Sequence, residues 1–219
     1  MSLLKSESNS ATADDWARWG SGVVSDALRK LGKPFQAMDG SIRPLASDMI
    51  TAGPAFTVRC YPGATWALEK ALEAADPGSV LVVDAGGRPD VIIMGGLMAA
   101  RASARGIAGA IIDGAVRDIP HILATGLPVF SKYICPRAGT YAEIGECQTT
   151  ICCGRLPVCP GDRIVADQSG IVVVPQEVLL EVALTADLIA RREKVMEEQL
   201  RLGASLQEAA HTARDAERE

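Results

Sequence analysis

The sequence predicts an α/β fold in which alternating helices and strands give way to a β-rich half within one domain. Through the centre of the chain, helix-length segments alternate with short apolar segments that are bounded by glycine and proline. Between residues 127 and 175, β-like segments follow one another with no helix-length pattern among them. The 219 residues are enough for one large core, so we expect a single domain with appendages.

The helical segments of the first half share Ala, Leu and charged residues, and each ends at a helix-breaking residue. They are residues 16–31, 62–78 and 96–106, with Gly32, Pro77-Gly78 and Gly106 as their stops. Ser21 or Ser25 is the candidate cap of the first helix. The strand segments are short and apolar, and they are residues 50–60, 79–87, 91–96 and 107–114.

The second half predicts strands over residues 127–136, 149–167 and 170–175. From Gln176, helical periodicity predicts a long helix that Gly203 ends, and a weaker helix follows Ser205. Residues 1–13 are polar and Ser-rich, which predicts a disordered lead-in. We therefore expect this lead-in, an α/β domain over residues 14–178, and a C-terminal helical extension over residues 179–219.

Composition narrows the function. The net charge is −5 and no Lys- or Arg-rich run is present, so we expect no nucleic-acid partner, because such partners need a basic surface. No apolar run approaches the ~20 residues that span a bilayer, and the N-terminus lacks the order of a signal peptide. We expect a cytoplasmic protein without a membrane partner.

The few histidines limit the chemistry. Only His121 and His211 are present, and the six cysteines lack the spacing of a zinc site. We expect the cysteines to be small buried residues. Catalysis would then depend on carboxylates, arginine, backbone amides and a hard, oxygen-binding cation.

The stretch IIDGAVRD places two charges after an apolar strand. Asp113-Gly114 is a turn signal, and Arg117 and Asp118 follow just past the strand end. The pair is either an ordinary surface ion pair or a site that holds an anionic substrate and a cation together.

Two glycines upstream favour the second interpretation. Gly95 and Gly96 precede a helix that begins near Leu97, which leaves the amides of Leu97 and Met98 without side chains in front of them. The alternative is that the glycines only permit close packing. Together with Arg117, the two amides would hold one small carboxylate.

The run GGLMAARASARGIAGAIIDGAVRD resembles the signature of the 4-hydroxy-4-methyl-2-oxoglutarate aldolase/RraA-like family. VVSDALRKLG, MDGSIRPL, AGPAFTV, DPGSVLVVDAGG, LPVFSK and PGDRIVADQSGIVVVP resemble family segments in the same order, over about residues 20 to 178. The resemblance implies a swivelling β/β/α sandwich in homo-oligomeric rings, trimers or hexamers. It leaves the activity open among class II pyruvate aldolase, oxaloacetate decarboxylase and non-enzymatic regulator of RNA degradation.

The resemblance also implies roles for residues. Arg117 would hold and polarise a small 2-oxo acid substrate, and Asp118 would bind a divalent metal cation, Mg²⁺ or Mn²⁺. The amides of Leu97 and Met98 would bind the pyruvyl carboxylate. Asp26 and Glu193 would supply carboxylates from a neighbouring subunit, with a solvated helix face as the alternative for Glu193.

The chain departs from the family pattern in two places. Gly96 stands where the family usually has Asp or Glu, and Pro62-Gly63-Ala64-Thr65 stands where it usually reads Pro-Gly-Asp-Asn. We expect a metal-dependent lyase that releases pyruvate, and the missing carboxylate would impair aldol cleavage more than decarboxylation. The alternative is a non-catalytic regulator that acts through protein–protein contacts.

Overall fold

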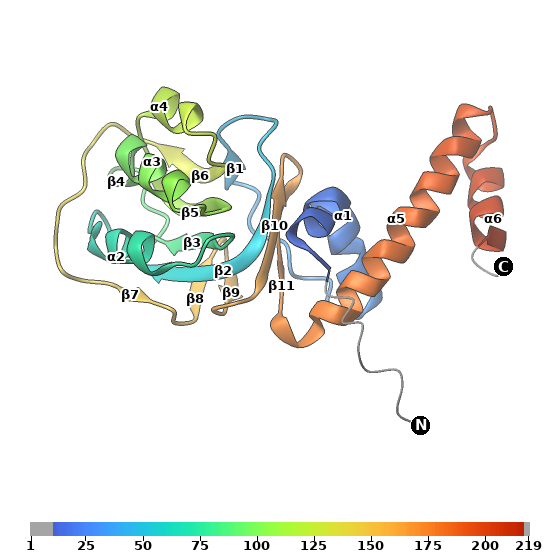
Figure 1. The fold of residues 1–219 in the computed structure, drawn as a ribbon, viewed down its shortest axis with the longest axis horizontal. Helices are drawn as coiled ribbons and strands as arrows, with labels where there is room; N and C mark the ends of the chain where they lie inside the picture. The colour runs from blue at the N-terminus through green and yellow to red at the C-terminus, as the bar shows by residue number, and fades with distance from the viewer. Residues whose placement is uncertain (1–10, 217–219) are drawn as a thin grey trace.

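The computed structural model describes residues 11–216, which form one mixed nine-stranded sheet, a separate two-stranded hairpin and surrounding helices (Figure 1). The strands are β1 (Arg43–Pro44), β2 (Thr51–Arg59), β3 (Val80–Asp84), β4 (Ile92–Met94), β5 (Gly109–Val116), β6 (Val129–Ile134), β7 (Glu146–Cys147), β8 (Ile151–Cys153), β9 (Leu156–Val158), β10 (Arg163–Asp167) and β11 (Gly170–Val174). The helices are α1 (Ala13–Lys30), α2 (Trp66–Ala74), α3 (Gly96–Ala104), α4 (Ile119–Ala124), α5 (Leu179–Arg201) and α6 (Leu206–Ala216), with a 3₁₀ turn at Gln176–Val178.

The main sheet has the order β1-β6-β5-β3-β2-β10-β11. Strands β2, β3, β5 and β6 run parallel, and α2, α3 and α4 lie on one face of them (Figure 1). Leu68 and Leu72 of α2 and Ala99 of α3 pack on this face against Val83 and Ile112. The short apolar strands and alternating helices are therefore a series of βα units, as predicted.

The other face of the parallel strands closes on the β-rich half. Hairpin β8–β9 packs there, and its Ile151 and Val158 join Phe130 and Ile111 in a second core. The segment over residues 36–45 forms hydrogen bonds near both edges of the sheet. The Met38 N–H donates to Ile171 O of β11 at 2.9 Å, and the Leu45 N–H donates to Val129 O of β6 at 3.0 Å. The sheet is therefore nearly closed.

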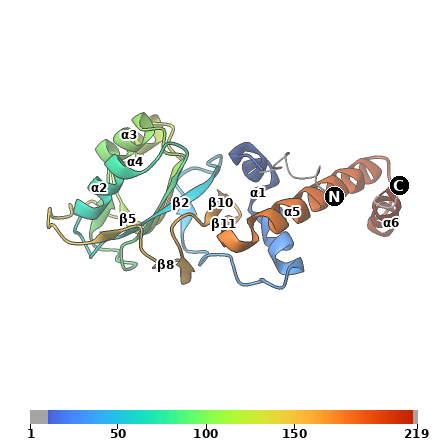
Figure 2. The ribbon, with the colours of Figure 1, turned by 60° about the horizontal axis from the view of Figure 1, so that its bottom comes forward.

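A third core lies on the outer face of β10 and β11. Trp16 and Trp19 of α1 meet edge to face at 5.2 Å and pack with Val182 and Ala186 of α5. Beyond this contact α5 projects away from the domain, and α6 folds back along it (Figures 1 and 2). No helix within residues 11–216 is long and apolar enough to cross a membrane.

Helix α1 begins earlier than predicted. Thr12 caps it, and the Thr12 hydroxyl and the Asp15 carboxylate satisfy each other's backbone N–H groups. Ser21 is not a helix cap: its N–H and hydroxyl donate to Asp167 at 2.7 and 2.8 Å, beside a kink at Gly20 (φ 73°). The predicted lead-in falls mostly on residues outside the described range. Helix α4, six residues long, was not predicted because it is too short to show periodicity.

Asp113 and Gly114 are not a turn, which corrects the prediction made from IIDGAVRD. Both lie inside β5, whose eight residues are all buried. The pairing of β5 with β6 shifts register between Ile112 and Ala115, so the Asp-Gly dipeptide marks an irregularity in the strand and not its end. A Cβ atom at Gly114 would lie 2.8 Å from the Ala85 Cβ, so close packing against the β3 end requires glycine.

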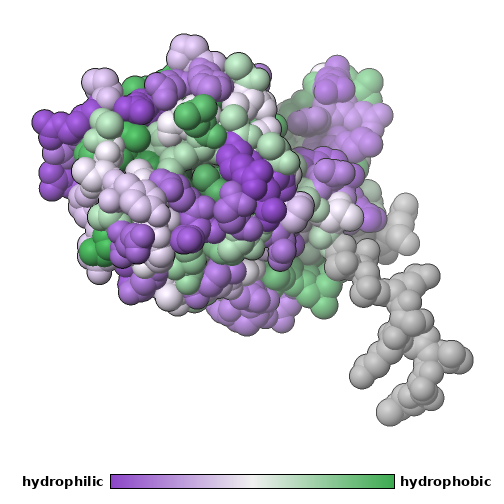
Figure 3. Space-filling view, turned by 60° about the vertical axis from the view of Figure 1, so that its left-hand side comes forward, coloured by the Kyte–Doolittle hydropathy of each residue, from purple (hydrophilic) through white to green (hydrophobic). Residues whose placement is uncertain are grey.

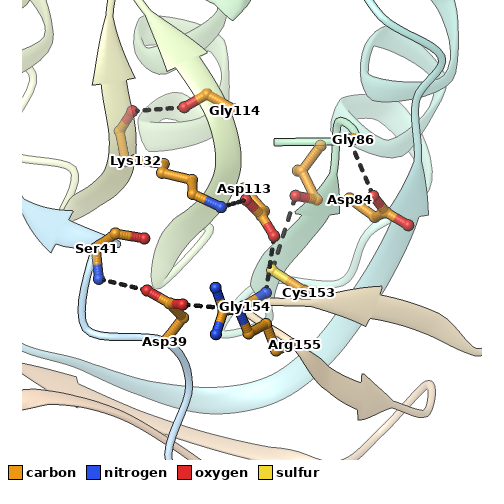
Figure 4. A network of polar contacts seen from close by, with 12 residues as sticks. Asp39, Ser41, Asp84, Gly86, Asp113, Gly114, Lys132, Cys153, Gly154 and Arg155 are labelled. Atoms are coloured by element: carbon orange, nitrogen blue, oxygen red, sulfur yellow. Dashed lines mark hydrogen bonds and ion pairs between the residues drawn. The ribbon is translucent and has the colours of Figure 1, made fainter. Parts of the chain in front are cut away.

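The Asp113 carboxylate joins segments that are distant in sequence (Figure 4). It accepts hydrogen bonds from Lys132 Nζ of β6 at 3.1 Å and from the Gly154 N–H of the β8–β9 hairpin at 2.9 Å. Asp39 contacts Arg155 of the same hairpin at 3.0 Å. These bonds fasten the hairpin to the ends of the parallel strands, so Asp113 has a structural role.

The cysteines only partly follow the prediction. All six are free thiols, and Cys60 and Cys153 are buried. Burial raises the pKa of Cys60 to about 12, so this thiol stays protonated and unreactive at neutral pH. Cys152 and Cys159 are exposed, contrary to expectation, because they lie on the outward side of β8 and in the loop after β9.

Asp167 should contribute measurably to stability because it satisfies two buried donors of Ser21. We expect Asp167→Ala to lower the free energy of unfolding by about 1–3 kcal/mol in chemical denaturation. Glu198→Ala, at an exposed residue of α5, is the control and should change it by less than about 0.5 kcal/mol. Equal effects of the two substitutions would contradict this role.

The same comparison should depend on pH. Burial by itself would raise the pKa of Asp167, but hydrogen bonds from Ser21 and Ser169 outweigh it and lower the pKa. A lowered folded pKa stabilises above the unfolded value of about 3.9, and this contribution disappears as pH falls through the folded value. The difference between wild type and Asp167→Ala should therefore shrink below about pH 4.

Candidate functional site

A cavity of about 230 Å³ lies at the end of β4 and β5, against the first turn of α3. It contains every residue that the sequence placed at the substrate except the two acids proposed to come from a neighbouring subunit. Its lining is Thr65, Ile92, Gly95, Gly96, Leu97, Met98, Arg117, Asp118, Ala138 and Gly139.

Arg117 and Asp118 follow the last residue of β5, as predicted. Asp118 adopts a left-handed backbone conformation (φ 60°, ψ 41°), which is uncommon for a residue with a side chain. The bend turns the chain from the sheet into α4 and leaves both side chains at the cavity. Asp118 Oδ2 accepts a hydrogen bond from the Gly96 N–H at 3.3 Å and lies 3.5 Å from Arg117 Nε.

The Arg117 Nε atom is buried and has no hydrogen-bond partner within residues 11–216. Its 3.5 Å approach to Asp118 is an ion pair without hydrogen-bond geometry. Trp19 Nε1, Arg105 Nε and Arg163 Nε are unpaired in the same way, so an unpaired Nε does not by itself mark a ligand site. The Arg117 side chain as a whole is 39% exposed and lines the cavity, so its guanidinium is available to a bound anion.

The first turn of α3 provides further donors. Gly95 is the N-cap and no side chain caps the helix, so the amides of Leu97 and Met98 have no partner inside the helix. No acidic residue lies in this turn to offset the positive end of the helix dipole. A Cβ atom at Gly95 would lie 3.1 Å from Asp118 Oδ2, so glycine lets α3 and the Arg-Asp pair approach each other closely.

His121 explains why residue 96 has no side chain. A Cβ atom at Gly96 would lie 2.6 Å from His121 Cγ and 2.8 Å from His121 Cβ. The imidazole of α4 therefore occupies the space that a side chain at residue 96 would need. The sequence alone did not indicate this, because residues 96 and 121 meet only after α3 and α4 pack together.

The segment Pro62-Gly63-Ala64-Thr65, which the sequence singled out by its departure from the family pattern, reaches the cavity at Thr65. The sequence missed Gly139, which lines the same cavity. The two segments are joined where the Thr140 N–H donates to Gly63 O at 2.6 Å and the Thr65 N–H donates to Thr140 O at 3.2 Å. Nothing local marked residues 138 and 139, which reach the site through a loop from the β-rich half.

Asp26 and Glu193 are not brought to this cavity within one chain. Asp26 lies exposed on α1 and contacts Arg29 at 3.4 Å, and Glu193 lies exposed on α5 beside a separate cavity that Trp19 and Arg18 also line. Both helices pack on the opposite side of the molecule from α2, α3 and α4 (Figure 1). Any role of these two acids at Arg117 requires a second subunit.

The donor set suits a hard cation that is held mainly by water and substrate. Asp118 is the only carboxylate in the cavity lining, and within the described range no three His, Cys, Asp or Glu side chains converge as a metal cage. Mg²⁺ is commonly bound through one or two carboxylates while it keeps several waters. The residues present therefore fit Mg²⁺ or Mn²⁺ and do not suit zinc, which prefers nitrogen and sulfur ligands.

The RraA-like family model, described as Aldolase/RraA, matches residues 22–173. The chain belongs to this family. It is 35% identical to a Halalkalibacterium halodurans protein that carries the name of a 4-hydroxy-4-methyl-2-oxoglutarate aldolase, over 86% of this chain and 90% of that protein. The predicted family resemblance is confirmed.

Solved structures agree with the family assignment. A Pseudomonas syringae protein has a TM-score of 0.79 at 30% identity, over 90% of this chain and 95% of that one. Streptomyces coelicolor RraAS2, described as an unusual member of the RNase ES inhibitor RraA family, has a TM-score of 0.77 at 27% identity, over 88% and 97%. The predicted fold class, an α/β fold of RraA-like type, is confirmed.

The contact between residues 96 and 121 can be tested by a double-mutant cycle. We expect Gly96→Ala to destabilise the fold by about 1–3 kcal/mol, because the new methyl overlaps the imidazole. His121→Ala in the same chain should recover most of this loss. Gly22→Ala is the control: a Cβ atom there meets nothing within 4 Å, so stability should stay the same or rise. Additive effects at residues 96 and 121 in chemical denaturation would contradict the contact.

Proposed function

We propose that this member of the Aldolase/RraA family is a lyase that cleaves a carbon–carbon bond of a 2-oxo acid and releases pyruvate. The observation that carries the proposal is that Arg117, Asp118 and the first turn of α3, which no side chain caps, line one cavity. A guanidinium beside uncapped helix amides matches a small carboxylate. The relative that carries an aldolase name supports the same chemistry.

Each residue then has a distinct task. The amides of Leu97 and Met98 bind the substrate carboxylate at the positive end of α3. Arg117 directs its guanidinium at the oxygen on which negative charge develops as the bond breaks. Asp118 is oriented by the Gly96 amide and offers its carboxylate to Mg²⁺ or Mn²⁺. The bound cation supplies Lewis acidity toward the 2-oxo group.

The absence of a carboxylate at residue 96 bears on the reaction. Aldol cleavage requires a base for the substrate hydroxyl, whereas decarboxylation requires only stabilisation of the enolate. The cavity lining contains no carboxylate besides Asp118. We therefore propose oxaloacetate decarboxylation and aldol cleavage as equal candidate reactions. Both leave an enolate of pyruvate, and a proton donor from a second subunit would protonate it in either case.

That donor is proposed to come from a neighbouring subunit in a ring. Asp26 of α1 and Glu193 of α5 are exposed, and neither lines the cavity of its own chain. Leu180, Leu184 and Leu188 form an apolar row on α5 and are 59%, 50% and 58% exposed. Such a row on a projecting helix favours contact with another copy, which would bring these acids to a partner's cavity.

The second candidate function is regulation of RNA degradation through protein contacts. The likeness to the Streptomyces RNase ES inhibitor family favours it, and the leucine row of α5 would then contact a different protein. This function requires no catalytic role for Arg117. Activity measurements therefore separate the two candidates.

Arg117 and Asp118 should be essential for pyruvate release. In a lactate-dehydrogenase-coupled assay with oxaloacetate and 4-hydroxy-4-methyl-2-oxoglutarate, with and without Mg²⁺ or Mn²⁺, we expect Asp118→Ala to abolish metal-dependent turnover. Arg117→Lys should lose about 10²-fold or more, because lysine lacks the planar fork. Both variants should keep the wild-type melting temperature within a few degrees.

The matched control is the Arg88–Asp90 pair, which is bidentate at 2.8 Å and about as exposed as Arg117 and Asp118. Arg88→Lys and Asp90→Ala should leave turnover unchanged, because exposed pairs contribute little. Wild-type turnover in both site variants would show that the Arg117–Asp118 pair is structural. No turnover in the parent on either substrate would favour the regulatory function.

The ring makes a prediction of its own. Light scattering at micromolar concentration should give at least three times the mass of one chain. The reason is that contact with other copies would bury the exposed leucine row of α5. Leu184→Glu and Leu188→Glu together should reduce the mass. A monomeric parent would eliminate the cross-subunit roles of Asp26 and Glu193.

A further inference from the structure

A second cavity, of about 510 Å³, lies between α2 and α3. Its lining is Trp66, Glu69, Lys70, Leu72, Glu73, Leu97, Met98, Arg101 and Tyr141. Figure 3 views this end of the molecule and shows apolar residues between strongly polar ones. We call this cavity the α2–α3 groove.

The α2–α3 groove adjoins the candidate site. Leu97 and Met98 line both cavities, so the first turn of α3 is a wall that the two share. Thr65 of the site and Glu69 of the groove are joined by a hydrogen bond of 2.8 Å. A molecule whose carboxylate is bound at the start of α3 has room to extend across Leu97 into the groove.

The groove is apolar where a ligand would lie. Leu72 is buried and Met98 is partly buried, and both pack in the core between the parallel strands and helices α2, α3 and α4. Leu97 and Tyr141 are 81% and 63% exposed, although both are large and apolar or aromatic. A cluster of exposed apolar side chains that adjoins a site typically marks a ligand surface.

The charges around the groove are mostly engaged. Arg101 holds Glu73 through two bonds of 2.6 and 2.8 Å, and Glu69 is bound to Thr65. The Lys70 ammonium lies 5.6 Å from the centre of the Trp66 ring, so it covers the indole without entering an ion pair. The groove therefore offers apolar and aromatic surface in which Arg101 and Glu73 neutralise each other, while Glu69 and Lys70 enter no ion pair among the described residues.

We propose that the α2–α3 groove binds the distal part of the substrate and that this part is a bulky apolar group, preferably aromatic. The substrate class is then 2-oxo acids whose chain carries such a group beyond the reacting carbons. This inference rests on the proposed function, because it takes the 2-oxo acid end to be bound by Arg117 and the α3 amides.

Calorimetric titration tests the proposal without turnover. The probes are 2-oxobutanoate, 2-oxo-4-phenylbutanoate and 2-oxo-5-phenylpentanoate, all with Mg²⁺ present. We expect at least one phenyl acid to bind about tenfold or more tightly than 2-oxobutanoate, the effect of burying a phenyl ring in an apolar groove. Arg117→Lys should weaken all three probes alike.

Substitutions in the groove test whether it causes the preference for the phenyl acids over 2-oxobutanoate. Tyr141→Ala and Trp66→Ala should each reduce it to less than about threefold. Phe35→Ala is the matched control, an aromatic residue 85% exposed and outside both cavities, and it should keep the full preference. Tyr141 is the cleaner test, because Trp66 also packs against the core.

Different failures have different meanings. Equal affinities for the three probes, or a preference that persists in both groove variants, would overturn the groove assignment and leave the proposed function intact. Groove variants that change only the mass in light scattering would show that another subunit covers the groove. Failure of 2-oxobutanoate to bind, or binding that is indifferent to Arg117→Lys, would overturn the proposed function and this inference with it.

Discussion

The candidate site depends on the confinement of β5. This strand lies between β3 and β6, β4 pairs with its last residues, and all eight of its residues are buried. Because the backbone of β5 is hydrogen-bonded to a strand on each side, the chain leaves the sheet at one fixed point. It does so through Asp118 in a left-handed conformation, a strain of about 1–3 kcal/mol that the surrounding ladder offsets. The direction of Arg117, the contact with Gly96 and the start of α4 all follow from that bend.

The same bend assembles polar groups that the chain itself does not satisfy. Within residues 11–216 no side chain caps the first turn of α3, and this turn lines one small cavity together with Arg117. The proposed function assigns these donors to the carboxylate of a substrate, which would supply the acceptors that the described residues do not. The neighbouring α2–α3 groove would then add affinity through apolar surface without competing for these donors.

The two aspartates of IIDGAVRD have different roles because their surroundings in the fold differ. Asp113 directly follows Ile112 and Asp118 directly follows Arg117, and the sequence predicted a turn at the first. In the fold Asp113 is buried and bound by Lys132 and Gly154, so its carboxylate is consumed in holding the β8–β9 hairpin (Figure 4). Among the described residues, the Asp118 side chain accepts a longer bond from the Gly96 N–H and remains half-exposed. The difference arises from partners 19 to 41 residues away from Asp113.

The sequence by itself determined the α/β class, the order of its longer helices and strands, the family, and the segments that form one side of the cavity. Those features depend on hydrophobic periodicity, glycine and proline positions, and neighbours within a few residues. Only the tertiary structure decided that Asp113-Gly114 continues a strand, that His121 fills the space beside Gly96, and that residues 138 and 139 complete the cavity wall. It also kept Asp26 of α1 and Glu193 of α5 out of the cavity lining of their own chain. These outcomes depend on which distant surfaces meet when the sheet nearly closes, and no local pattern encodes that contact.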